Sequence, residues 1–583
     1  MKQPIVYKIK DNIEALKDFE KSLLFCDEEK LQRIILSYPT VYIHNWLEKG
    51  DYEVYVGESN NIVQRTRQHF DKTSEEDKWQ EKLLEKDALL YIIGHEHFNK
   101  SMTLDIENKL MHYMMSVDGV KKVHNLRENP QTEYYPSEEM EEIFSKIWRK
   151  LRKLDKNLFP LESKIKDSAI FKASPLHKLT IGQENAKSLI LEKVRKGLDK
   201  NGEKQLIFID GEAGTGKTVL NSSTFYELFC INEENNKKID CHLLVNHNEQ
   251  VTVYEQIANK LGITDKYGEV VSKPTSFINK HTPNNPVDVV FIDEAHLLLT
   301  QGKQSYTGKN QLQDIIDRSK VTVVMFDENQ ILTTEQYWEM ELLEKYRNDA
   351  KQQNNYIELT EQLRMQADIE TVDWIDSFTK DGIVKPLNNS NKNYSIEIFD
   401  NPSELEKQIK KKASSEPTAL SRLVATYDWD YNQKKREEFD DRMSKYWEVV
   451  IGGWHKPWNR ELEYELTPQE KRRLKGLSWA EQPQTIDEVG STFTIQGFDL
   501  NYAGVILGPS VKYRDGRVIL DPEESKNNKA TQNRTLSDKT KQKFGEELLK
   551  HEVRVLMTRG VNGLYIYACD DELRKALKAA VEG

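Results

Sequence analysis

Short apolar runs that end in glycine or acidic residues recur along the chain. One run covers 206–209 and leads into a glycine-rich turn, another covers 287–292 and leads into two acids, and a third begins at 321 and leads into Asp327. Apolar runs of about four to eight residues bounded by turn signals are typical of buried strands. The pattern therefore predicts at least three buried strands in the central part of the chain.

Hydrophobic patterning also predicts a smaller ordered region near the N-terminus. Two β-like runs, 39–46 and 52–59, are followed by a helical stretch at 60–70 that an asparagine caps. Arg65 and His69 lie four residues apart in this stretch, so on a helix they share one face. We expect that face to lie near the end of the preceding strand.

Two further helical patterns follow. The first, 103–115, sets Glu107 on or beside an apolar stripe. A partly buried carboxylate needs a partner, and either a divalent metal or a nearby arginine would serve. The second pattern lies within 131–175, where apolar residues recur at helical spacing and predict an amphipathic connector. Residues 1–37 predict a strand and one or two helices.

The turn after the run at 206–209 has the sequence GEAGTGKT and carries the clearest chemistry in the chain. A strand, this loop and a helix form the context in which backbone N–H groups surround phosphate oxygens. Lys217 can reach the β- and γ-phosphates, and Thr218 can offer its hydroxyl to Mg²⁺. We therefore predict a nucleoside triphosphate site whose loop residues include Gly211, Gly214, Thr215, Gly216, Lys217 and Thr218.

Acidic and amide residues at the ends of the next two strands complete this prediction. Asp293 and Glu294 end the run at 287–294, which suits an aspartate in the Mg²⁺ shell and a glutamate that activates water. Gln330, shortly after the third run, can sense the γ-phosphate and orient that water. Each residue alone is as typical of a solvated turn as of a catalytic site, and the order of the three segments favours catalysis.

Composition narrows the class of protein. The 583 residues carry a formal net charge of −12, with 37% hydrophobic and 31% charged residues, which indicates several globular domains. No segment approaches the roughly 20 apolar residues of a membrane span, and the first residues do not resemble a secretion signal. The four cysteines lack metal-ligand spacing. We expect a cytoplasmic protein, and local basic grooves for nucleic acid stay compatible with the negative charge.

From about residue 176 to the C-terminus the chain resembles superfamily 1 helicases, and most closely the Schlafen group 3-like DNA/RNA helicase domain. The segments that carry this resemblance are GEAGTGKT, VDVVFIDEAH, LTEQLRM, STFTIQGFDL and VRVLMTRG. The resemblance implies two RecA-like lobes with parallel sheets. It also implies that Arg364 and Arg559 act as arginine fingers and that Gln183 recognises adenine. Aromatic residues in 427–484 indicate an insertion with a small core of its own, base stacking being the alternative. Residues 521–550 predict an exposed or mobile loop.

Residues 38–130 resemble the GIY-YIG nuclease domain, in which Thr40-Val41-Tyr42 stands where the family has Gly-Ile-Tyr. The resemblance implies a metal-dependent phosphodiesterase in which Glu107 holds Mg²⁺ or Mn²⁺ and Arg65 stabilises the phosphate. It implies six catalytic positions: Tyr42, Tyr55, Arg65, His69, Glu107 and Asn125. A degenerate module that only binds nucleic acid is the alternative.

Together these features predict an α/β protein with five parts. They are an N-terminal helical extension (1–37), a GIY-YIG nuclease-like domain (38–130), a helical connector (131–175), a first RecA-like lobe (176–355) and a second lobe (356–583). The predicted function is an ATP-hydrolysing, helicase-like motor with an endonuclease that cleaves nucleic acid, DNA being favoured over RNA, in antiviral defence or repair. The alternative is a nucleic-acid-activated ATPase switch that does not translocate.

Overall fold

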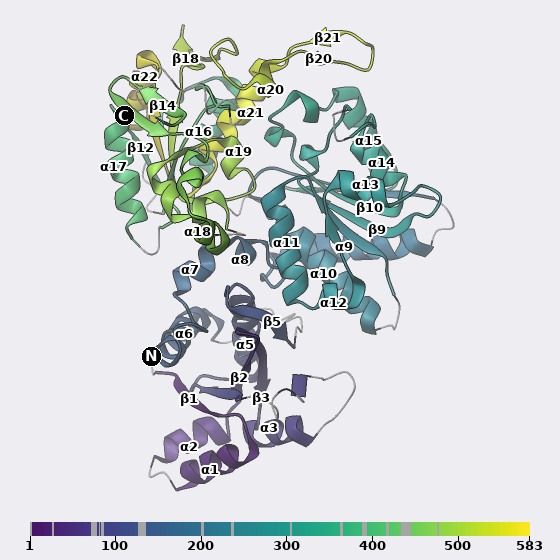
Figure 1. Cartoon of the computed structure of the whole chain (residues 1–583), viewed down its shortest axis with the longest axis vertical. Helices are drawn as coiled ribbons and strands as arrows, with labels where there is room; N and C mark the ends of the chain where they lie inside the picture. The colour runs from purple at the N-terminus through teal and green to yellow at the C-terminus, as the bar shows by residue number, and fades with distance from the viewer. Residues whose placement is uncertain are drawn as a thin grey trace. The chain divides into compact units, whose positions relative to one another are not determined.

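The structure is a computed structural model, and the chain divides into two compact units, Met1–Lys178 with Val253–Val270 and Leu179–Thr252 with Val271–Gly583 (Figure 1). The structure describes residues 3–25, 28–71, 79–80, 82, 87–125, 136–199, 203–234, 238–302, 306–361, 365–387, 393–415, 419–432, 445–474 and 477–582. Among these residues, no helix has the length and apolar content needed to cross a membrane.

The first unit is built on a five-stranded sheet in the order β1-β4-β2-β3-β5. Its strands are β1 (Ile5–Lys10), β2 (Thr40–Glu48), β3 (Asp51–Ser59), β4 (Leu89–Gly94) and β5 (Val120–His124). All neighbours are antiparallel except β3 and β5, which run parallel. Because β1 forms the edge of this sheet, residues 1–37 belong to the domain, and the predicted boundary at residue 38 is wrong.

Helices pack against this sheet. They are α1 (Ile13–Leu24), α2 (Glu29–Leu36), α3 (Ile62–Asp71), α5 (Lys100–Met115) and α6 (Met140–Leu154). One core combines Phe19 of α1 and Ile35 of α2 with Tyr42 and Trp46 of β2. The connector helix α6 buries Ile143, Phe144, Ile147, Trp148 and Leu151, the stripe that the helical spacing predicted. Two short helices, α7 (Glu162–Asp167) and α8 (Ala169–Ala173), complete the segment before the second unit.

The second unit contains two lobes, each with a parallel sheet. The sheet of the first lobe has the order β11-β6-β10-β9-β7-β8, and every pair in it is parallel. Its strands are β6 (Gln205–Gly211), β7 (Cys241–Val245), β8 (Val271–Ser272), β9 (Val287–Asp293), β10 (Ser319–Phe326) and β11 (Tyr356–Leu359). The lobe therefore continues past the predicted end at residue 355.

Helices cover both faces of the first lobe's sheet (Figure 1). On one side lie α9 (Ile181–Asp199) and α10 (Lys217–Glu234), and on the other lie α13 (Pro274–Lys280), α14 (Gln311–Ile316) and α15 (Met340–Gln352). Burial on both faces explains why β6, β9 and β10 are continuous apolar runs rather than alternating ones. Helix α11 (Asn248–Lys260) follows β7. It begins in the second unit and ends in the first, because the division between the units falls at 252–253.

The second lobe has a parallel sheet in the order β12-β22-β17-β13-β16. Its strands are β12 (Ser395–Ile398), β13 (Arg422–Ala425), β16 (Val489–Gly490), β17 (Leu500–Leu507) and β22 (Gly560–Ala568). One core joins the sheet to α16 (Ile369–Asp376), α21 (Gly545–Met557) and α22 (Asp571–Glu582), and a second core contains α17 (Pro402–Ala413). The predicted α/β class with parallel sheets is confirmed.

The insertion at 427–484 folds as a hairpin of β14 (Glu448–Ile451) and β15 (Trp454–Pro457) with short helical turns. Trp447 and Trp458 are buried in the core that also contains β13 residues. Tyr427, Trp429, Tyr431 and Trp454 pack against the same core. These aromatics therefore pack as core residues, but their core also contains Ile506 of β17 and Tyr565 of β22, so it belongs to the second lobe and is not the insertion's own.

The segment 521–550 contains regular elements, so the prediction of a loop is wrong, although many of its residues, 537–543 among them, are exposed as predicted. It contains α20 (Asn528–Thr531), the hairpin of β20 (Arg534–Thr535) and β21 (Lys541–Gln542), and the first turn of α21 (Figure 1). The Arg534 guanidinium donates to the Thr334 carbonyl and to Thr300 Oγ1, the latter at 3.0 Å. The polar composition that suggested mobility instead provides hydrogen bonds to the first lobe.

Candidate functional site

The loop 211–218 lies between β6 and α10, as the sequence predicted. Gly214 and Gly216 have φ of 92° and 76°, values that favour glycine and turn the backbone sharply at these two positions. The Lys217 ammonium donates to the carbonyls of Gly211 at 2.6 Å and Glu212 at 2.8 Å. The loop therefore holds its lysine close to the backbone that would surround the phosphates.

Acidic residues follow the carboxyl ends of the adjacent strands β9 and β10. Asp293 ends β9 with 1% of its surface exposed, and Glu294 follows it in the left-handed region with a φ of 49°. Glu294 Oε1 accepts from Gln250 Nε2 at 3.5 Å, and its other oxygen lies 3.4 Å from His296 Nε2. Burial lowers the pKa of His296, so this imidazole is neutral beside the glutamate.

A chain of polar contacts runs from the phosphate loop to the second lobe. Asp327 Oδ2 lies 3.4 Å from Lys217 Nζ and accepts from Gln330 Nε2 at 2.7 Å. Gln330 Oε1 accepts in turn from Arg559 Nη2 at 2.7 Å. Burial alone would raise the pKa of Asp327, but the Lys217 charge together with His296, the Gln330 hydrogen bond and Arg554 brings it below its usual value. The chain contains three groups that can donate to phosphate oxygens, Lys217, Gln330 and Arg559, and the carboxylate of Asp327 holds two of them.

Two more residues complete this arrangement. Gln496 Nε2, on the segment after α19 (Thr492–Ile495), donates to the Gln330 carbonyl at 3.0 Å. Gln183, at the start of α9, accepts from the Thr180 N–H at 3.0 Å and donates to the Thr215 carbonyl at 3.4 Å. The amide of Gln183 is thus fixed against the phosphate loop.

A second candidate site lies in the first unit. A cavity of about 350 Å³ is lined by ten residues, and five of the six predicted nuclease positions are among them: Tyr42, Tyr55, Arg65, Glu107 and Asn125. The sixth, His69, lies beside it, with its Nε2 3.1 Å from the Tyr42 hydroxyl. The structure therefore brings together residues that are up to 83 positions apart in the chain.

The environment of this cavity fixes the protonation and orientation of its groups. Burial and the nearby Tyr55 raise the pKa of Tyr42 well above its ordinary value, so its hydroxyl stays protonated at neutral pH. Asn125 has a φ of 63° and donates through Nδ2 to the Val56 carbonyl at 2.7 Å and to Glu107 Oε1 at 3.0 Å. The amide of Asn125 therefore holds one oxygen of Glu107 in place.

A buried pair that the sequence did not indicate lies behind the tyrosines. His44 Nδ1 and Asp11 Oδ2 are 2.5 Å apart, and neither side chain is exposed. The His44 ring packs edge-on against Tyr42 and Tyr55. Asp11 is separated from His44 by 33 residues and lies in the segment that was predicted to be an extension, so no local pattern pointed to the pair.

Comparison with known proteins assigns the family. Residues 204–570 match the Schlafen group 3, DNA/RNA helicase domain. This chain belongs to that family. An uncharacterized protein of Saccharomyces cerevisiae is 30% identical over 432 residues, which are 68% of this chain and 90% of the yeast protein.

Three solved structures also show similarity to this Schlafen group 3 family member. Drosophila ORC bound to DNA is 16% identical over 40% of this chain, with a TM-score of 0.20. C. elegans PCH-2 is 16% identical over 41%, with a TM-score of 0.19. Mss116p, with its NTE and C-tail deleted and bound to ssRNA and AMP-PNP, is 11% identical over 68%, with a TM-score of 0.25. The chain spans only 51%, 60% and 65% of these three structures, and the family assignment rests on the sequence.

The predicted ATP-site residues of this Schlafen group 3 family member fall into two groups, and all of them except Gln183 lie within the matched residues 204–570. The first group surrounds the ends of β6, β9 and β10 and consists of the loop residues together with Asp293, Glu294, Gln183, Gln330 and Arg559. The second group is Arg364 alone, which lies outside the described residues. The sequence did not single out Gln250, Gln496 or Arg554 as site residues. Gln496 and Arg554 lie in STFTIQGFDL and VRVLMTRG, two of the segments that carry the helicase resemblance, but no spacing marked their side chains.

Proposed function

We propose that this chain is an ATP-hydrolysing motor that acts on nucleic acid. The observation that carries the proposal is the continuous contact from Lys217 through Asp327 and Gln330 to Arg559, because it joins both lobes at the phosphate loop. Hydrolysis of ATP needs charge stabilisation at the γ-phosphate and a positioned water. In this proposal Arg559 and Lys217 stabilise charge, and Arg364 is assigned a second arginine-finger role.

The residues around the loop fit a Mg²⁺–ATP complex. Thr218 and Asp293 carry the oxygen ligands that Mg²⁺ prefers, and the metal would neutralise charge between the β- and γ-phosphates. Glu294 accepts a proton from the attacking water in the proposed mechanism, and Gln330 orients that water. Gln183 recognises adenine through an amide that is already fixed by Thr180 and Thr215.

We propose further that the first unit is a metal-dependent nuclease of the GIY-YIG type. The cavity that contains Tyr42, Tyr55, Arg65, Glu107 and Asn125 supports this assignment. Within the described part of the chain, no group of three or more His, Cys, Asp or Glu residues forms a metal cluster. A single carboxylate still fits Mg²⁺ or Mn²⁺, since Mg²⁺ usually keeps several waters as ligands. A metal held by Glu107 would supply positive charge at the phosphate.

The protein's own residues account for the remaining steps of phosphodiester cleavage. Arg65 lies at the cavity wall, where its guanidinium can stabilise the extra negative charge that develops on the phosphate. Tyr42 positions water through its hydroxyl, and as the water gives a proton to the Tyr42 oxygen, the hydroxyl proton of Tyr42 passes to His69 Nε2 along the 3.1 Å contact. Asn125 holds Glu107 by the hydrogen bond described above.

A combined cleavage and hydrolysis assay tests both proposals. Purified protein is incubated with plasmid, single-stranded DNA and RNA, with Mg²⁺ and with or without ATP, and DNA ends and phosphate release are both measured. We expect nucleic acid to stimulate phosphate release. Lys217→Ala should abolish ATP hydrolysis by weakening phosphate binding, and Glu294→Gln should abolish it while ATP still binds. Normal hydrolysis by the Glu294→Gln protein would contradict the assigned base.

The cleavage arm uses Glu107→Ala as the test variant and Lys217→Ala as its control. Because the two sites lie in separate units, Glu107→Ala should remove cleavage and leave ATP hydrolysis within about threefold of wild type. Cleavage that persists in Glu107→Ala contradicts the assigned metal ligand. Hydrolysis without cleavage, translocation or unwinding by the wild type would favour the alternative, an ATPase switch with a degenerate nuclease domain. A motor joined to a nuclease suits antiviral defence or repair, with DNA as the expected substrate.

A further inference from the structure

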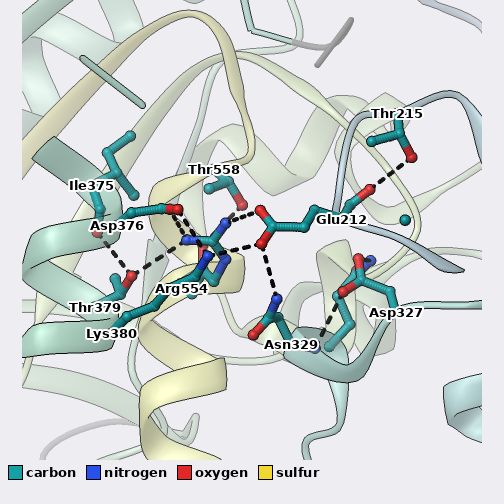
Figure 2. Close-up of polar contacts among 12 residues, drawn as sticks. Glu212, Thr215, Asp327, Asn329, Ile375, Asp376, Thr379, Lys380, Arg554 and Thr558 are labelled. Atoms are coloured by element: carbon teal, nitrogen blue, oxygen red, sulfur yellow. Dashed lines mark hydrogen bonds and ion pairs between the residues drawn. The ribbon is translucent and has the colours of Figure 1, made fainter. Parts of the chain in front are cut away.

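A second network connects the phosphate loop to the second lobe, separately from the contact between Gln330 and Arg559 (Figure 2). Its centre is Glu212, the second residue of the loop. Glu212 Oε2 accepts from Arg554 Nη2 at 2.5 Å, and Oε1 accepts from Lys380 Nζ at 2.8 Å. Asn329 Nδ2 reaches the same Oε1 at 3.4 Å. One carboxylate of the first lobe thus meets two cations of the second.

Arg554 is the buried member of this network. Only 7% of its side chain is exposed, and its Nη1 pairs with Asp376 and approaches Thr379 Oγ1 at 3.5 Å. Asp376 also pairs with Lys380 at 2.8 Å. Two carboxylates and two cations therefore alternate, and Figure 2 shows the guanidinium between Glu212 and Asp376. Because the Arg554 guanidinium is buried, removal of either carboxylate would leave its charge without full compensation. Glu212, Lys380 and Asp376 are 46%, 39% and 26% exposed, so water partly solvates these three.

Arg554 belongs to α21, and its carboxylate partner Asp376 and the ammonium of Lys380 come from two adjoining elements of the second lobe. Asp376 ends α16, and Lys380 lies in η5 (Ser377–Asp381), a π-helical turn that continues it. Single π-helical turns are rare and occur frequently at functional sites. Thr379 of the same turn donates to the Ile375 carbonyl at 2.8 Å. The turn places the Lys380 ammonium on Glu212 while Asp376 stays on Arg554.

Glu212 also belongs to the internal hydrogen bonding of the phosphate loop. Its carbonyl accepts from Thr215 Oγ1 at 3.0 Å and from Lys217 Nζ at 2.8 Å. Its side chain and its main chain therefore contact different partners. Through one residue, the lysine of the loop is joined to a buried arginine of the second lobe.

Arg554 and Arg559 are also coupled by chain geometry. Arg554 lies in the last turn of α21, and Arg559 follows the end of that helix, with its N–H on the Leu556 carbonyl. Thr558 Oγ1 donates to the Arg554 carbonyl at 2.8 Å. The contacts of Arg554 with Glu212 and Asp376 therefore also fix the position of the Arg559 backbone.

We propose that Glu212 and Arg554 form a positioning pair, which fixes the end of α21 on the phosphate loop and thereby places Arg559 for ATP hydrolysis. Arg554 acts through Arg559 and touches no phosphate. Lys380 contacts Glu212 and Asp376 contacts Arg554, so each of them keeps one side chain of the pair in place. This inference rests on the proposed ATPase activity and deepens it by naming the contact that couples the loop to the second lobe.

Steady-state ATP hydrolysis by the full chain tests the pair. Arg554→Gln and Glu212→Gln should each lower kcat by about tenfold and change KM for ATP by less than about threefold, because the pair positions Arg559 rather than binding ATP. The double variant should resemble either single variant, since both remove the same contact. Arg554→Lys should recover part of the loss. In an Arg559→Ala background, Arg554→Gln should add no further loss of kcat.

Arg514→Gln is the matched control, because Arg514 forms an ion pair with Asp570 in the same lobe but is 43% exposed. Its kcat should stay within about twofold of wild type. Two results would overturn the inference. One is a double variant whose loss of kcat is the product of the two single losses. The other is an Arg554→Gln change that lowers kcat as much in the Arg559→Ala background as in the wild type.

A second measurement is independent of hydrolysis. Without nucleotide, Arg554→Gln should speed amide exchange both in 211–217 and in 553–559, and Arg514→Gln should not. If the wild type hydrolyses no ATP, the proposed function fails, while faster exchange in both segments would still support the pair. Unchanged exchange in either segment would overturn the pair itself.

Discussion

At the scale of single residues, the Tyr42 ring explains why position 57, after Tyr55-Val56, is a glycine. Gly57 pairs with Tyr42 across β2 and β3. A Cβ atom at this position would lie 2.4 Å from the Tyr42 hydroxyl oxygen and 2.5 Å from the ring carbon that carries it. The glycine therefore leaves the space in which the Tyr42 ring lies at the cavity wall.

We predict that Gly57→Ala displaces the Tyr42 ring and lowers nucleic-acid cleavage by at least about tenfold, while ATP hydrolysis stays unchanged. Gly119→Ala is the matched control, because its Cβ atom would meet nothing closer than 3.8 Å. Cleavage rates and phosphate release of both variants are compared with wild type. Equal cleavage by the two variants would contradict this role of Gly57.

A second prediction at this scale concerns Glu552, which is buried in α21. Burial, together with the nearby Asp428, raises the pKa of Glu552 from 4.5 to about 8. In the unfolded chain the group ionises near the lower value. Between these two pH values the folded state binds more protons than the unfolded state, so its contribution to stability falls as the pH rises. Glu488, whose pKa burial also raises to about 8, acts in the same direction.

Glu552→Gln removes one of these titrations and keeps an oxygen for the Tyr427 N–H, which donates at 2.7 Å. We expect the melting temperature of the variant to exceed that of wild type by at least about 3 °C near pH 8, with a smaller difference near pH 5. Thermal melts of both proteins across this range test the sign. A difference that stays constant with pH would contradict it.

At the scale of elements, the segment 532–544 of the second lobe contacts the first lobe. Arg534 has a side chain that is only 3% exposed and lies beside the Tyr337 ring. Gln532 Nε2 donates to Thr334 Oγ1 at 2.9 Å, and Phe544 stacks on Tyr337 with ring centroids 3.9 Å apart. The hairpin β20–β21 is too short to be stable alone, so its order depends on these contacts.

We predict that Arg534→Ala speeds amide exchange across 528–542 and exposes this segment to limited proteolysis, because the Thr334 carbonyl loses its donor. Lys541→Ala provides the control, since Lys541 lies in the same hairpin and is exposed. Both variants are compared with wild type by hydrogen exchange. If Lys541→Ala has the same effect as Arg534→Ala, the anchoring role of Arg534 is wrong.

At the scale of the whole molecule, one chain passes three times between the two units. The crossings lie at 178–179, 252–253 and 270–271. The segment Val253–Val270 lies within the matched helicase domain and nevertheless belongs to the first unit, where Lys260 Nζ donates to the carbonyls of Met115 and Val117, each at 2.8 Å. Met115 is the last residue of α5, the helix that carries Glu107. Three covalent connections therefore join the proposed ATPase to the proposed nuclease.

We predict that nucleotide changes cleavage by the wild type and that Arg559→Ala abolishes this response, because closure of the lobes requires Arg559. Cleavage by both proteins is measured without nucleotide, with ATP and with a non-hydrolysable analogue, on a substrate that both bind equally. Identical rates in all six reactions would mean that the motor only concentrates the nuclease on its substrate.

The sequence alone determined the features that depend on neighbouring residues. Apolar runs located β6, β9 and β10, and helical spacing identified the buried stripe of α6. The order of glycines and lysine in 211–218 was sufficient to predict a phosphate loop between a strand and a helix. Hydrophobic periodicity and loop chemistry are local, so they are visible without a fold.

Tertiary structure decided what depends on residues far apart. Arg554 and Glu212 are separated by 342 residues, and Asp11 and His44 by 33 residues across different elements. An ion pair between distant segments leaves no periodic trace in either one, and a charged residue that will be buried has the same local pattern as one that stays solvated. The order of 521–550 and the place of β1 in the first sheet follow the same rule, because partners elsewhere in the chain satisfy their polar groups and bury their apolar ones.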